Sequence, residues 1–183
     1  MESRRLHAGE ERSFRHGVYM GSGTGTRHSM FGIFKKKTFE DEFSALQADM
    51  VDICNEYSCG EAEKIFIYVA YEGLLVTDHF YKINKQILAC HKLNDCSKKK
   101  EFDVSDECQE QVLDVLIEDV HKIREVCKKY NQPMFTEMRL TYEPETKKFN
   151  AEYKYEAQFT DDMGLSDIVN AWFEEEKAKL ENA

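Results

Sequence analysis

Residues 64–71 read Lys-Ile-Phe-Ile-Tyr-Val-Ala-Tyr, and this stretch decides the fold. Every position after Lys64 is apolar or aromatic, and the stretch is rich in the β-branched and aromatic residues that favour strands. Successive residues of a strand point to opposite faces of its sheet, so this strand presents apolar side chains to both faces. We therefore predict an interior strand here.

Two further strands follow it closely. Glu72-Gly73 makes a turn into a second strand at 74–81, and a break at 82–85 leads to a third strand at 86–93. Such short connections join antiparallel neighbours, so the three strands are predicted to form a meander. The polar stretch 94–104 is predicted to be an exposed loop.

A helix is predicted on each side of the meander. The first begins at Thr38, where Asp41 completes an approximate capping box, and it ends near Gly60. Its apolar residues recur every three or four positions and form a single stripe. They are Phe39, Phe43, Leu46, Met50, Ile53 and Tyr57. The longest helix begins at Ser105 and ends before Asn131.

The second half of the chain predicts a hairpin and a final helix. Apolar and polar residues alternate along 134–142 and again along 149–159, so the hairpin has one apolar face and one polar face. The mixed charges of the polar face favour cross-strand pairing. They are Glu137, Arg139, Glu152, Lys154 and Glu156. The final helix begins at Ser166 and has Trp172 on its apolar side.

The predicted order of elements is α-βββ-α-ββ-α. Runs of antiparallel strands interrupted by helices are typical of α+β proteins. We predict an α+β fold with an antiparallel sheet of about five strands and three helices, gathered largely on one face of the sheet.

The 183 residues are enough for one domain. Residues 1–29 contain five Arg, three Glu and almost no aliphatic side chains, so we interpret them as a disordered tail or an added leader. We predict one domain at 30–183. This part has 20 basic and 32 acidic residues, a formal charge of −12, whereas the whole chain carries −10.

This negative charge bears on the possible partners. An acidic chain repels phosphate backbones and attracts basic proteins, so we expect no direct nucleic-acid partner. No apolar run approaches the ~20 residues that span a bilayer, and no secretion signal opens the sequence. We expect a soluble, cytoplasmic protein with no membrane partner.

Six cysteines are distributed over the predicted elements. In a chain of this size without a signal peptide, buried free thiols are expected rather than disulfides, with zinc binding as a second interpretation. Cys90, His91 and Cys96 offer soft ligands, but they lack the paired C-x2-C spacing of zinc sites. We therefore predict no metal and no cofactor.

The sequence contains no convincing catalytic motif. No glycine-rich phosphate loop joins a predicted strand to a helix, and no Gly-flanked Ser marks a nucleophile elbow. His121 and Glu125 lie one helical turn apart, which is common on any charged helix. His79 is expected at a surface or sheet edge. We predict that the protein is not an enzyme.

The candidate partner-binding residues are acidic and lie toward the C-terminus. They are Asp161, Asp162, Asp167, Glu174, Glu175 and Glu176. A run of this kind is most often the solvated side of a helix. Its functional interpretation is a surface that captures a basic protein, because like charges in one region speed association and reject wrong partners.

Several of these features together resemble a known family. The strand at 65–71, the long helix that ends before Asn131, the hairpin of 135–140 and 148–155, and the later Trp172 are similar to the YezG-like immunity proteins. The resemblance covers about residues 38–180 and is one of pattern, not of a catalytic signature. It implies a cytoplasmic antitoxin without an active site, which blocks a nuclease toxin exported by a type VII secretion system.

The leading hypothesis is therefore an immunity protein whose partner is a cognate toxin with a basic catalytic domain. One alternative is a secretion chaperone or adaptor that holds an exported effector. Another is a metal-dependent enzyme that uses Cys90, His91 and Cys96.

Overall fold

The structure is a computed structural model of the chain, and it describes residues 36–96, 101–157 and 165–182. The chain divides into two units, residues 1–35 and 36–183, and every described residue belongs to the second. The predicted domain boundary at residue 30 lies outside the described residues, as do Asp161 and Asp162.

The described residues form the predicted α+β fold. Its elements are α1 (Phe39–Tyr57), β1 (Lys64–Glu72), β2 (Leu74–Ile83), β3 (Gln86–Ala89), a 3-10 helix (Cys90–Asp95), α2 (Asp106–Lys129), β4 (Glu137–Glu143), β5 (Lys148–Lys154) and α3 (Leu165–Glu181). The predicted order of helices and strands is confirmed, with the short 3-10 helix as an addition.

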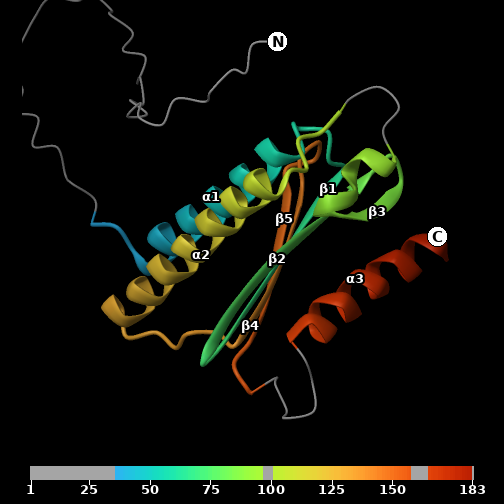
Figure 1. Ribbon diagram of the computed structural model, residues 1–183. Helices are drawn as coiled ribbons and strands as arrows, with labels where there is room; N and C mark the ends of the chain where they lie inside the picture. The colour runs from blue at the N-terminus through green and yellow to red at the C-terminus, as the bar shows by residue number, and fades with distance from the viewer. Residues whose placement is uncertain (1–35, 97–100, 158–164, 183) are drawn as a thin grey trace, which may run out of the picture. The chain divides into compact units, whose positions relative to one another are not determined.

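The five strands make one antiparallel sheet in the order β3-β2-β1-β4-β5. The predicted interior strand, β1, is the middle strand, between β2 and β4. α1 and α2 lie side by side on one face of the sheet, and α3 lies on the other (Figure 1). Two helices thus share a face, while the third covers the face that they leave open.

Both faces of β1 are buried, as its sequence predicts. Ile65, Ile67 and Val69 point into the larger core beneath α1 and α2. Phe66 and Tyr68 point the other way, into a smaller core with Trp172 of α3. The Trp172 ring lies 5.7 Å from that of Phe66 and meets it edge to face. The double burial of β1 therefore requires α3.

Both helices that cover the larger core begin at the capping residues that the sequence predicts. The Asp41 amide donates to Thr38 Oγ1 at 3.2 Å, and the Thr38 amide donates to Asp41 Oδ2 at 3.0 Å, so the predicted capping box is present. The Ser105 hydroxyl accepts from the Cys108 amide at 3.3 Å and begins α2.

Two predictions were wrong between β2 and α2. The third strand ends at Ala89 and continues as the 3-10 helix, in which Leu93 is buried in the larger core and the Cys90 carbonyl accepts from the Tyr57 hydroxyl at 3.1 Å. In the stretch predicted to be an exposed loop, Phe102 is buried in the larger core. Its amide donates to Asn94 Oδ1 at 2.8 Å, and its carbonyl accepts from Asn94 Nδ2 at 3.0 Å. A single aromatic anchor thus holds this loop to the core.

All six cysteines lie in the described residues, and no disulfide joins them, as predicted. Only Cys54 and Cys127 are buried, so the expected burial holds for two of the six. Among the described helices, none is both long enough and apolar enough to cross a membrane.

Asp119 places a carboxyl group in the contact between α1 and α2. It is fully buried, and Oδ1 accepts from Lys122 Nζ at 3.2 Å. Burial raises the pKa of Asp119 to about 6, against the opposing Lys122 ammonium and with a smaller contribution from the Asp49 carboxylate. The contact between the helices is therefore weakened when Asp119 ionises.

We predict that Phe80→Ala lowers the free energy of unfolding by about 3–4 kcal/mol. Phe80 is buried, stacks on Phe66 at 4.4 Å and lies 5.0 Å from the Trp172 ring. Trp172 is the single tryptophan, so its fluorescence during urea unfolding measures the loss of α3 packing directly. The exposed Leu74→Ala is the control. A decrease in the free energy of unfolding of less than about 1 kcal/mol for Phe80→Ala would contradict the packing of the smaller core.

We predict that Asp119→Asn raises the free energy of unfolding by about 1–2 kcal/mol at pH 7.5 and changes it little at pH 4. A raised pKa means that stability from Asp119 is present below the ordinary value of 3.8 and is lost as the pH rises through about 6. Urea unfolding at both pH values measures the difference. Glu118→Gln, which removes the exposed partner of the same lysine, should leave the pH dependence unchanged.

Candidate functional site

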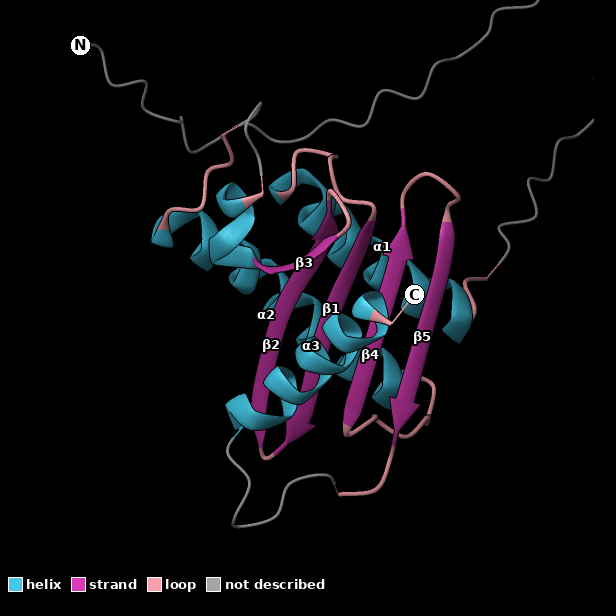
Figure 2. Ribbon diagram, turned by 90° about the vertical axis from the view of Figure 1, so that its right-hand side faces the viewer, coloured by secondary structure: helices cyan, strands magenta, loops and turns pink. Residues whose placement is uncertain are grey.

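A polar groove lies between α3 and the β4–β5 hairpin. α3 packs on β1, β2 and β3. Its C-terminal end reaches the β4–β5 hairpin (Figure 2). The groove encloses about 290 Å³ and is called the α3 groove below. It is lined by Lys64, Arg139, Thr141, Asn150, Glu152, Trp172, Glu175, Glu176 and Lys179.

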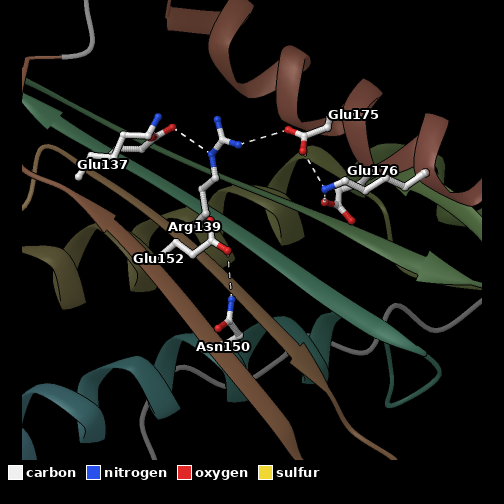
Figure 3. A network of polar contacts seen from close by, with 8 residues as sticks. Glu137, Arg139, Asn150, Glu152, Glu175 and Glu176 are labelled. Atoms are coloured by element: carbon white, nitrogen blue, oxygen red, sulfur yellow. Dashed lines mark hydrogen bonds and ion pairs between the residues drawn. The ribbon is translucent and has the colours of Figure 1, made fainter.

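Arg139 of β4 lines this groove and belongs to a network of polar contacts (Figure 3). Its Nε donates to Glu137 Oε1 at 3.1 Å, and its Nη1 lies 3.5 Å from Glu175 Oε2. The guanidinium carbon also lies 5.5 Å from the centre of the Trp172 ring, within cation–π range. One side chain therefore joins β4 to α3.

Glu137 is the buried end of the same network. The sequence predicts it on the polar face of the hairpin, and it does lie there, yet it is only 1 % exposed. Lys154 of β5 is directly opposite, with Nζ 2.5 Å from Glu137 Oε2. Burial alone would raise the pKa of Glu137, but the Lys154 ammonium and the Arg139 guanidinium outweigh it and hold that pKa below its ordinary value.

The predicted acidic run is divided by this groove. Glu175 and Glu176 line it, and Lys179 binds both, with Nζ at 2.7 Å and 2.8 Å from their carboxylate oxygens. Lys179 and Arg139 lower the pKa of Glu175. The groove thus mixes both signs of charge and is not a single acidic patch.

Two of the predicted acids lie outside the groove lining. Asp167 is exposed in the first turn of α3, and Glu174 is exposed one position before the groove residues. They are seven positions apart, which places them on one face of the helix. Glu174 has Lys177 at 3.9 Å. Whether these acids contact a partner stays a prediction.

Three other candidate residues contact partners outside the pairs that the sequence suggested. Glu125 is bound by Lys128 at 2.8 Å. The Cys90 thiol lies 3.5 Å from Gln109 Oε1, and the Cys96 thiol lies 3.4 Å from the Leu93 carbonyl. Within the described ranges, no three or more His, Cys, Asp or Glu side chains are grouped to hold a metal ion.

His79 is buried, so the expectation of a surface or edge histidine was wrong. It is 1 % exposed, because its ring packs edge to face against Tyr57 of α1 at 5.2 Å and against Tyr81 at 5.4 Å. Burial lowers its pKa to about 4, and its Nδ1 lies 2.8 Å from the Tyr81 hydroxyl. His79 is therefore a neutral core residue at pH 7.

The net charge of residues 30–183 lies entirely on the three helices, a distribution that the predicted acidic run near the C-terminus does not include. α1 has six acidic residues and no Lys or Arg; α2 has seven acidic and four basic residues, and α3 five and two. These excesses equal the −12 of residues 30–183, where the remaining acidic and basic residues are equal in number. Counting charge for each predicted element would have revealed this.

No model of a protein family matches the chain, and no curated protein matches it.

We predict that Glu137→Gln lowers the free energy of unfolding by about 2 kcal/mol at pH 7, because it leaves Arg139 and Lys154 without their buried counter-charge. The pKa of Glu137 is depressed, so its stabilisation is present above the ordinary value of 4.5 and is lost as the pH falls below it. Urea unfolding at pH 7 and pH 3.5 should show the difference shrinking. Glu152→Gln, exposed on the same face, is the matched control.

Proposed function

We propose that this chain is an immunity protein, a cytoplasmic antitoxin without catalytic activity that binds and neutralises a secreted nuclease toxin in a stoichiometric complex. The observation that carries the proposal is that the net charge of −12 on residues 30–183 lies on the three helices, whose acidic side chains are exposed or half-buried apart from Asp119. The resemblance to YezG-like immunity proteins supports the same function. It rests on the strand, helix, hairpin and Trp172 pattern.

The chemistry of a nuclease explains why such a surface would inhibit it. An enzyme that binds nucleic acid needs Lys and Arg side chains against the phosphates. An acidic protein can occupy the same cationic surface, so substrate and inhibitor compete for it. The charge attracts the partner over about a Debye length, roughly 8 Å at physiological salt. Shape and apolar contacts then determine how long the complex lasts.

A neutral sheet beneath acidic helices suits this task. The charges of the polar hairpin face are compensated internally, as in the Glu137 network, so they add little long-range field. The helices carry the excess of acidic residues and lie on the outer sides of the sheet. A partner with a basic surface is therefore attracted to the helices.

The proposal is tested by co-expressing the chain with the protein encoded by the adjacent gene. We expect the two to co-purify, and we expect cleavage of plasmid DNA by the partner to cease at a one-to-one ratio. No complex and no inhibition would contradict the proposal. A stable complex with full nuclease activity would instead support the chaperone or adaptor.

The predicted contact residues are tested in the same assay. Glu174→Lys should weaken inhibition about tenfold, equivalent to 1.4 kcal/mol, if α3 meets the basic surface. Glu145→Lys in the hairpin turn makes the same change of charge away from α3 and should be within about twofold of the unmodified chain. Equal losses of inhibition for Glu174→Lys and Glu145→Lys would show that inhibition depends only on the total charge of the chain and not on α3.

A further inference from the structure

A second groove lies on the opposite face of the sheet, between α1 and β5. It consists of two adjoining hollows of about 240 Å³ and 290 Å³, and Ser44 lines both. α1 contributes Glu40, Ser44, Ala48 and Asp52. We call it the α1–β5 groove.

The wall of this groove formed by the hairpin is aromatic. Tyr142 and Phe149 line one hollow, and Tyr153 and Tyr155 line the other. Phe149 is 45 % exposed and Tyr155 is 56 % exposed, so two of the largest apolar surfaces among the described residues adjoin one groove. Apolar surface gathered in this way is typical of a binding site rather than of scattered surface residues.

An edge strand of the sheet runs beside the groove. β5 is the last strand of the sheet and pairs only with β4 among the described strands. An edge strand can accept an extended segment as a further strand, whose alternate side chains then point to one face. On the α1 side of β5, that face is the groove.

The acidic residues of α1 favour a bound segment with basic residues. This helix has six acidic residues and no basic residue, and Glu40 and Asp52 stand toward the two ends of the groove. They are twelve residues apart, which is about 18 Å along a helix. Six residues of extended chain cover about 20 Å. A segment with basic residues six positions apart therefore matches both acids.

We propose that the α1–β5 groove binds an extended segment of another protein, added as a sixth strand beside β5, with two alternate apolar residues in the groove and Lys or Arg at each end. In sequence the segment reads basic-x-apolar-x-apolar-x-basic. The inference does not require the partner to be a toxin. It concerns a different face of the sheet from the α3 groove.

The charge also separates this occupant from others. A second copy paired through β5 would bring two α1 helices, each with six acidic residues, to one interface, where they repel. Nucleic acid is repelled by the same residues. A basic-ended apolar segment is attracted by both the charge and the aromatic wall.

Selection of random nonapeptides displayed on phage against the full chain tests the proposal. We expect enriched peptides to carry the basic-x-apolar-x-apolar-x-basic pattern. A synthetic peptide of that pattern should lose affinity at least tenfold for Ala48→Arg, measured by fluorescence anisotropy. Ala48 is exposed on α1 and lines the groove, and Arg there fills it and repels the basic ends. Arg suits a helix nearly as well as Ala.

Ala45→Arg is the matched control, since Ala45 is exposed on the same helix and lies outside the lining of either hollow. It should bind the peptide within twofold of the unmodified chain. Enrichment of no peptide, equal loss for both variants, or equal affinity for an acidic-ended peptide would overturn the proposal. So would a dimer, measured by sedimentation, that Ala48→Arg dissociates. These outcomes leave inhibition of a nuclease unaffected, so the two proposals fail separately.

Discussion

The double burial of β1 is the constraint on which the rest of the structure depends. A strand that is apolar on both faces exposes one of them unless each is covered. α1 and α2 bury Ile65 and Ile67, while Trp172 of α3 covers Phe66 and Tyr68. The fold is therefore three-layered at its centre. Toward β5 only one face is covered by helices, which leaves the polar hairpin face and both grooves at this side.

The layers divide the electrostatics of the chain. Buried charges in the sheet are compensated where they occur, as Arg139 and Lys154 compensate Glu137. The helices carry the excess of acid, and α1 alone carries half of it. Such an arrangement gives a field at the surface without leaving an unpaired charge in the core. Asp119 is buried and has Lys122 as its counter-ion, and its burial makes the contact between α1 and α2 sensitive to pH.

Local patterns were sufficient to predict the elements. The Thr38 capping box, the alternation along the hairpin and the apolar run of β1 each depend on neighbours in the sequence, so the sequence alone reveals them. The face chosen by α3 does not follow from its own pattern. The apolar stripe around Trp172 predicts that this side of the helix packs against the sheet. It does not predict which of the two sheet faces the helix packs on.

The errors arose where distant residues determine burial. Glu137 alternates like a surface residue, yet Arg139 and the facing Lys154 enclose it. His79 and Phe102 are buried by elements far away in the chain. The candidate site was incomplete for a different reason: the predicted acids lie toward the C-terminus, whereas α1, which has acidic residues and no Lys or Arg, lies near the start of the domain.

We expect the exposed acidic helices on the neutral sheet to attract a basic protein partner. The most direct measurement is the association rate of the chain with the protein of the adjacent gene, by stopped-flow fluorescence, between 50 mM and 500 mM NaCl. Electrostatic attraction predicts a rate that falls at least tenfold over this range, with a dissociation rate that changes little. An association rate that does not depend on salt would contradict the account.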